Sequence, residues 1–139
     1  MALPIKNGKI GTKYGVPNHG AVKWQAGHHQ GVDFPCPVGT PVYAVADGVV
    51  TGIGCPWGPG FGNHSVVVQH TVGGKKYWVI YAHCSATHTR VGSKVKKGDL
   101  IAYSGAEGHV TGPHLHLEAH TVPHWDITTD VNPQPLLNA

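Results

Sequence analysis

The density of glycine and proline is the feature of this sequence that most restricts its fold. Glycine (20) and proline (11) supply 31 of the 139 residues and recur at short intervals along the chain. Both disfavour helix interiors, glycine because of its backbone entropy and proline because it lacks an N–H group. No stretch of ten residues keeps a helical period of apolar side chains. The spacing instead favours short β-strands joined by tight turns.

Composition excludes several other classes of protein. Hydrophobic residues make up 40% of the chain and charged residues 12%, which is unlike a disordered or fibrous protein. No apolar run reaches the ~18 residues of a membrane-spanning helix, so we expect no membrane partner. The net charge of +3 is not gathered in a basic stripe, so we expect no nucleic-acid partner. The length predicts one domain over residues 1–139.

Segments rich in β-branched residues predict most of the strands. We expect six of them to pair in sequence as three hairpins: residues 40–46 with 48–53, 65–70 with 76–83, and 91–97 with 100–104. His114–His120 alternates with period two and predicts one more strand. Residues 1–39, 54–63 and 105–113 carry loop signals, and the chain beyond Pro123 is expected to be irregular. The predicted fold class is mainly β, with antiparallel sheets packed in a small single domain.

The cysteines do not indicate a site. Cys36, Cys55 and Cys84 are odd in number and show no C-x-x-C spacing, so they predict neither a disulfide framework nor a thiolate zinc site. Three free thiols are favoured over one disulfide with a single free thiol. None of the three possible pairings is preferred.

The arrangement of the histidines indicates a metal site. His29 lies four residues before Asp33, His83 ends an apolar strand, and His114 and His116 share one face of a predicted strand. Catalytic Zn²⁺ takes three nitrogen or oxygen ligands and keeps a further position for water. One histidine from the first segment, Asp33 and one histidine from the last would supply that set. Two further histidines would remain for proton transfer.

These segments resemble the lysostaphin-like zinc endopeptidases, which cut the peptides of peptidoglycan. The resemblance covers residues 8–120, and we expect residues 121–139 to form an irregular C-terminal tail. The matching motifs are HQGVDF at 29–34, GTPVYA at 39–44, DGVV at 47–50, YAH at 81–83, VKKGDLI at 95–101 and GPHLHLE at 112–118. The family fold is an antiparallel sheet whose loops wall a narrow groove.

The resemblance implies a role for each of five residues. His29, Asp33 and His116 match the ligands of one zinc ion per chain. His83 and His114 match the pair that flanks the metal-bound water and the scissile carbonyl, and either of them can be the base. The partner implied is a peptidoglycan stem peptide or crossbridge, hydrolysed by a monomer. Glycine bridges and D-alanyl–diaminopimelate crosslinks are both open as substrates.

Residues near these motifs are expected to have lesser roles. His28 lies outside the spacing and is expected at the surface, whereas Glu118 either accepts the free ring N–H of His116 or is exposed. Six histidines are expected at the surface: His19, His64, His70, His88, His120 and His124. His109 is expected to line the groove. Three aromatic residues are expected either in the walls of the groove or in the core: Trp24, Trp57 and Phe61. Related enzymes place a tyrosine before the first ligand, and here Trp24, Lys23 or Tyr14 would fill that place.

The beginning of the chain leads to an expectation about its source. Met1 is not followed by a basic leader and an apolar block, so we expect no signal peptide and no inhibitory pro-segment. This favours a bacteriolytic, antimicrobial phage endolysin, made in the host cytoplasm and released at lysis to act on the bacterial cell wall. One alternative is a degenerate family member that binds and activates other wall hydrolases. Such proteins lose metal ligands, whereas this chain keeps the residues at all five positions. A structural zinc domain is disfavoured because such sites are closed and rich in cysteine.

Overall fold

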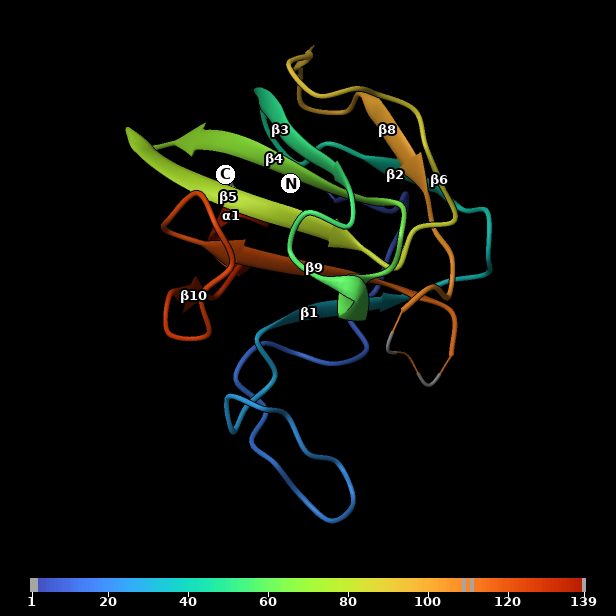
Figure 1. The fold of residues 1–139 in the computed structure, drawn as a ribbon, viewed down its shortest axis with the longest axis vertical. Helices are drawn as coiled ribbons and strands as arrows, with labels where there is room; N and C mark the ends of the chain where they lie inside the picture. Colours follow the sequence, from blue (N-terminus) through green and yellow to red (C-terminus); the bar gives the residue numbers. More distant parts are fainter. Residues whose placement is uncertain (1–2, 109, 111, 139) are drawn as a thin grey trace.

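The computed structural model describes residues 3–108, 110 and 112–138. Strands dominate this part of the chain, in keeping with its glycine and proline content (Figure 1). The strands are β1 (Gly31–Pro35), β2 (Pro41–Tyr43), β3 (Gly48–Gly54), β4 (Ser65–Val72), β5 (Lys75–Ala82), β6 (Ala86–Thr87), β7 (Lys94–Val95), β8 (Leu100–Tyr103), β9 (His114–His120) and β10 (Asp130–Val131). Two short helices complete the fold: the 3-10 turn η1 (Pro59–Phe61) and α1 (Gln134–Leu137).

The strands form two antiparallel sheets. The larger sheet has the order β1-β9-β5-β4-β3-β7, with β10 beside β9, and the smaller has the order β2-β8-β6. Figure 1 shows the long strands β4, β5 and β9 side by side at the centre of the larger sheet. The predicted fold class, a mainly β domain of packed antiparallel sheets, is confirmed. Within the described residues, no helix is long and apolar enough to cross a bilayer.

The two faces of the larger sheet have different surroundings. One face builds the main core from alternate residues of the central strands: Val79 and Tyr81 of β5, and Leu115, Leu117 and Ala119 of β9. The opposite face carries a smaller apolar cluster of Val67, Ile80 and Ala82, packed against Trp57, Phe61 and Trp78. The polar residues of β9 alternate with its leucines and therefore lie on this second face. Most of these polar residues are nevertheless buried, because loops cover them.

Two of the three expected hairpins are wrong. β2 pairs with β8 in the smaller sheet, whereas β3 pairs with β4 and β7 in the larger one. The chain therefore changes sheet at Asp47–Gly48 and again between β7 and β8. The two crossings bind each other, since Ala44 N–H donates to Asp99 O and Gly98 N–H donates to Ala44 O, both at 2.9 Å. The third expected hairpin, β4 with β5, is confirmed, with pairing from Val66 and Tyr81 to Val72 and Lys75.

The ends of the chain are more regular than expected. Residues 31–35, inside the segment expected to be loop, form β1 and pair with β9. The part expected to be an irregular tail contains β10, which also pairs with β9, and α1, which buries Leu136 and Leu137. Leu136 and Leu137 join the main core, so the tail contributes to the packing of the domain.

Two histidines expected at the surface are fully buried. His70 accepts a hydrogen bond from the Tyr81 hydroxyl at 2.8 Å, and that hydroxyl accepts one from Val45 N–H at 3.1 Å. Burial lowers the pKa of His70 and raises the pKa of Tyr81. His120, the other buried histidine, belongs to the network described below. The remaining four of the six are exposed as expected: His19, His64, His88 and His124.

The three cysteines are free thiols, as favoured from the sequence. Cys84 is buried in the main core, on the side opposite the polar face of β9. Burial raises its pKa to about 12, so its thiol stays protonated at neutral pH.

Candidate metal centre

His29, Asp33 and His116 come together on the polar face of β1 and β9. The strand register places Asp33 directly opposite His116, and His29 lies just before β1. One potential ligand atom from each residue lies within 4.8 Å of the other two. His116 Nδ1 is 2.8 Å from Asp33 Oδ1, and His29 Nε2 is 3.3 Å from Asp33 Oδ2. The carboxylate thus lies between the two imidazole rings.

The second nitrogen of each ring is held by a hydrogen bond outside the cluster. His29 Nδ1–H donates to the carbonyl of Lys13 at 3.0 Å, and His116 Nε2–H donates to Glu118 Oε1 at 2.8 Å. This leaves His29 Nε2 and His116 Nδ1 as the nitrogens that face Asp33. Metal-ligating histidines usually donate their other N–H in this way, to a carbonyl or a carboxylate. Two imidazoles and a carboxylate are also a donor set that Zn²⁺ prefers, so these residues fit a zinc ion.

The charges around the cluster favour a bound cation. Burial would raise the pKa of Asp33, but hydrogen bonds from His116 and His29 outweigh it and hold that pKa well below its usual range. For His116, burial lowers the pKa, while hydrogen bonds to Asp33 and Glu118 raise it to about 9. The two carboxylates therefore stabilise positive charge at this ring. A metal ion would meet the same stabilisation and would displace the proton from Nδ1.

His83 and His114 lie beside this cluster. Their ring centroids are 5.0 Å apart, and that of His83 is 5.9 Å from His116. Each donates Nδ1–H to a backbone carbonyl, His83 to Glu107 at 2.6 Å and His114 to Gly112 at 2.8 Å. His114 Nε2 is 3.6 Å from Asp33 Oδ1. Both rings thus keep Nε2 for other partners.

The backbone of His83 supports its placement. Its φ of 66° lies in the left-handed region, which residues other than glycine seldom adopt. His83 N–H donates to the Phe61 carbonyl at 2.8 Å, which helps to hold this conformation after the end of β5. Burial, followed by the charge of His116, lowers the pKa of His83 to about 4. Its imidazole is therefore neutral at neutral pH.

Aromatic residues contact the imidazole rings of this face. Trp24 lies 5.2 Å from His29, Phe61 stacks on His116 at 6.2 Å, and Trp57 meets His120 edge-on at 5.2 Å, all between ring centroids. From the sequence, each of these aromatic residues could belong either to a wall of the groove or to the core. Of the candidates for the tyrosine of related enzymes, Trp24 is the one that contacts His29.

His28, Tyr14 and Asp130 form a separate group behind His29. His28 Nε2 and the Tyr14 hydroxyl both donate to Asp130 Oδ2, at 2.8 and 2.7 Å. Burial and Asp130 raise the pKa of Tyr14 to about 12. His28 stays outside the metal cluster, as expected, and its side chain is 33% exposed. Asp130 could not be predicted from the sequence, because its partners Tyr14 and His28 lie about a hundred positions before it.

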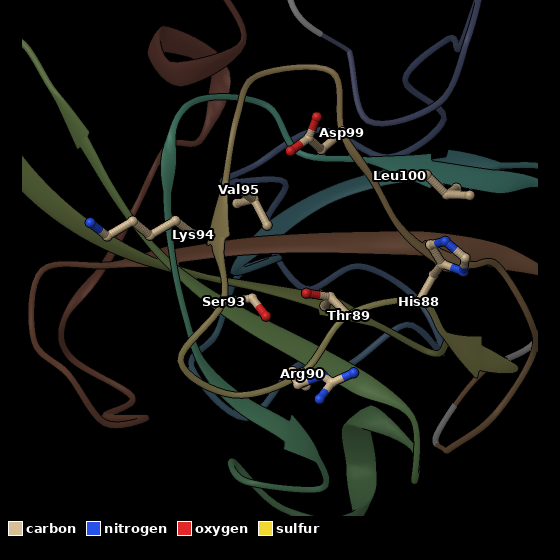
Figure 2. A pocket seen from close by; sticks show the side chains of 8 residues that line it. All are labelled: His88, Thr89, Arg90, Ser93, Lys94, Val95, Asp99 and Leu100. Atoms are coloured by element: carbon tan, nitrogen blue, oxygen red, sulfur yellow. The ribbon is translucent and has the colours of Figure 1, made fainter.

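Other expectations for the site have mixed outcomes. Glu118 is only 2% exposed and binds His116, so the exposed alternative is wrong. His109, expected in the groove, lies outside the described residues. A pocket of about 650 Å³ lies on another part of the surface and is lined by residues 88–90, 93–95, 99 and 100. Figure 2 shows the side chains that line it. Its charged side chains Arg90, Lys94 and Asp99 point in different directions, and none of the five expected site residues lines it.

Comparison with known proteins identifies close similarity over nearly the whole chain. The chain is 35% identical over 135 residues to the glycyl-glycine endopeptidase ALE-1 of Staphylococcus capitis, covering 97% of this chain and 35% of that protein. It is 47% identical over 90 residues to the peptidoglycan DD-endopeptidase ShyA of Vibrio cholerae, covering 65% of this chain and 20% of that protein. The catalytic domain of lysostaphin from Staphylococcus simulans superposes with a TM-score of 0.80 at 32% identity, covering 96% and 95% of the two chains.

These similarities concern one region of longer proteins. The chain spans about a fifth of the length of the Vibrio protein and about a third of that of the Staphylococcus capitis protein. Residues 27–133, which include all five expected site residues, match peptidase family M23. Because this match covers most of the chain and the fold agrees with it, the chain belongs to peptidase family M23.

Proposed function

We propose that this chain is a zinc-dependent endopeptidase that hydrolyses the peptide crosslinks of bacterial peptidoglycan. The observation that carries the proposal is the convergence of His29, Asp33 and His116, with His83 and His114 beside them. Membership of family M23 supports the peptidase activity. The names of two relatives, a glycyl-glycine endopeptidase and a peptidoglycan DD-endopeptidase, support the substrate class.

The proposed zinc ligands are His29 Nε2, the Asp33 carboxylate and His116 Nδ1. When bound, zinc polarises a peptide carbonyl and lowers the pKa of water from about 15.7 towards 7. The protein orients the ligands through Lys13 and Glu118, which fix the opposite nitrogens of the two rings. Burial of His29 and His116 limits access of bulk water to this side of the cluster.

The chain supplies proton transfer through His83 and His114. Both rings are anchored at Nδ1 by backbone carbonyls, so Nε2 is the atom that acts in each. One imidazole accepts the proton of the attacking water and passes it to the leaving amine. The other, as an imidazolium with a proton on both ring nitrogens, donates Nε2–H to the carbonyl oxygen as it becomes an oxyanion. The rings of Trp24 and Phe61, next to the ligand histidines, offer apolar contacts for the peptide on either side.

Digestion of purified cell walls tests this function. Walls with glycine bridges and walls with direct D-alanyl–diaminopimelate crosslinks would be treated with the zinc-loaded protein, and the products identified by mass spectrometry. We expect new amino termini at peptide crosslinks of at least one wall type, and no cleavage of the glycan strands. Intact crosslinks in both wall types, despite bound zinc, would contradict the proposal.

The proposed place of action is the bacterial cell wall, and the proposed state is a monomer. We also propose a bacteriolytic role, as a phage endolysin; a bacteriolytic protein should lower the turbidity of intact or outer-membrane-permeabilised cells. Light scattering during size-exclusion chromatography is expected to give a mass near the 14.7 kDa of one chain. A mass of twice that value at micromolar concentration would show a dimer instead.

A further inference from the structure

Glu118 is a buried carboxylate that receives three N–H donors. Its oxygen Oε1 accepts the hydrogen bond from His116 Nε2 at 2.8 Å. Its oxygen Oε2 accepts two more, from His120 Nε2 at 2.6 Å and from Trp125 Nε1 at 2.8 Å. The carboxylate is therefore fixed at both oxygens by N–H donors.

A second layer of contacts holds these donors. His120 is fully buried, and its Nδ1 lies 2.8 Å from Thr129 Oγ1. The Thr129 hydroxyl also lies within hydrogen-bond distance of the Asp126 carbonyl, at 3.1 Å. The segment Trp125–Thr129 thus closes over the side chains of β9 from the C-terminal side. His116, Glu118 and His120 are alternate residues of β9. Strand alternation therefore places their side chains next to one another on the same face.

Packing alone does not require this network. A buried charge is unfavourable unless every polar atom around it is paired, and an apolar side chain would fill the same space without that requirement. The network is fully paired: no buried side-chain nitrogen or oxygen among the described residues lacks a partner. The network reaches His116 Nε2, the ring nitrogen that does not face Asp33. It therefore contacts the metal cluster through His116.

We propose that Glu118, held by His120 and Trp125, is a positioning residue that fixes His116 for zinc binding. The carboxylate keeps the proton on His116 Nε2, so the lone pair remains on Nδ1, the nitrogen that faces Asp33. Trp125 and His120 prevent the carboxylate from rotating away, which makes residues 125–129 part of the site. This inference rests on the proposed function, because it assumes that His116 is a zinc ligand.

The substitution Glu118→Gln separates this role from space filling. Glutamine has nearly the same shape, but its amide offers one oxygen and one NH₂ group. Three N–H donors approach Glu118 from two sides, so either orientation of the amide places its NH₂ against at least one of them. If the oxygen faces His120 and Trp125, the NH₂ meets His116 Nε2–H and favours the wrong tautomer. If the amide oxygen faces His116, then His120 and Trp125 lose their acceptor.

Zinc affinity, measured by competition with a chelator, tests the proposal on the intact chain. We expect Glu118→Gln to weaken zinc binding about 10- to 100-fold. Trp125→Phe, which removes a single donor to Oε2 and keeps an aromatic ring, is expected to weaken it by a smaller factor. Asp99→Asn is the matched control, because it also removes one carboxylate charge but lies in an exposed turn between β7 and β8. Its zinc affinity is expected to equal that of the wild type.

The ring tautomer of His116 provides a second readout that general destabilisation would not change. Long-range ¹H–¹⁵N spectra of the zinc-loaded wild type should show the proton on Nε2, and Glu118→Gln should change this pattern. Wild-type affinity and an unchanged tautomer in Glu118→Gln and Trp125→Phe would overturn the inference, even if their melting temperatures fall. If Glu118→Gln does not fold, Trp125→Phe decides by the same two measurements. A wild-type chain that binds no zinc would instead refute the proposed function.

Discussion

Asp33 is the residue on which both candidate ligand histidines converge, so it gives the most direct test of the metal centre. Its two oxygens face His29 and His116, and its carboxylate supplies the negative charge of the cluster. We expect the wild type to hold about one zinc per chain after dialysis and Asp33→Ala to lose most of it. Metal analysis of both proteins checks this. His28→Ala is the neighbouring control and should keep its zinc, since His28 binds Asp130; full zinc in Asp33→Ala would disprove the assignment.

His83 and His114 are predicted to act in proton transfer and oxyanion binding while the metal remains bound. Replacing either by alanine should lower the rate of wall hydrolysis by about 10²- to 10⁴-fold. Zinc content should stay at the wild-type level, because neither residue is in the proposed ligand set. Rate and metal content are measured on the same preparations. Loss of zinc in His114→Ala together with retention in His116→Ala would show that His114, and not His116, is the zinc ligand.

The sequence and its family resemblance were sufficient to predict that these five residues lie close together, but not to predict the residues behind them. His29 and Asp33 have a recognisable spacing, and strand alternation placed His114 and His116 on one face, as observed. The supporting residues Trp125 and Asp130 have no such pattern. Their partners are distant in sequence or depend on the path of a loop, so only the folded chain brings them together.

At the scale of elements, β10 holds the loop that precedes β1. Asp130 pairs through its backbone with β9, and its carboxylate binds Tyr14 and His28. We expect Asp130→Ala to lower the free energy of unfolding by about 1–3 kcal/mol, because two donors lose a charged acceptor. Hydrogen exchange should become faster mainly between residues 12 and 30. Uniform acceleration over the whole chain, or none in this loop, would contradict a local role for Asp130.

The errors in the predicted topology have one physical cause. A pattern of β-branched residues shows where a strand lies but does not show its partner. β4 and β5 were predicted correctly because their turn, Val72–Lys75, contains two glycines with positive φ, at 59° and 78°, which closes a hairpin locally. Asp47–Gly48 resembles such a turn in sequence. There the chain passes from one sheet to the other, and Asp47 Oδ1 accepts the N–H of Lys97 at 2.9 Å.

At the scale of the whole molecule, one apolar core joins both sheets and the C-terminal segment. It includes Val42 and Ile101 of the smaller sheet, Val68 and Leu117 of the larger sheet, and Leu136 of α1. The polar face of β9 lies on the outer side of the larger sheet, covered by loops and not by this core. The site can therefore carry buried charges without placing any of them in the main core. His70 is a polar residue on the core side, where it forms a hydrogen-bonded pair with Tyr81.

This pair predicts a loss of stability in acid. Burial lowers the pKa of His70 below its unfolded value of about 6.5, so the unfolded chain binds the proton more tightly than the folded chain does. Stability from this residue is complete above pH 6.5 and falls as the pH drops towards its folded pKa. The loss between pH 7.5 and pH 5 is at most about 2 kcal/mol.

Denaturant unfolding of the metal-free wild type and of His70→Gln at the two pH values tests this. The variant should be less stable at pH 7.5, because it disturbs a buried hydrogen bond, yet should lose less stability on acidification. His83 and His116 also titrate in the folded protein, but they do so equally in both chains. The difference between the two pH responses therefore isolates His70. An identical response in both proteins would mean that protonation of His70 does not limit the stability of this core.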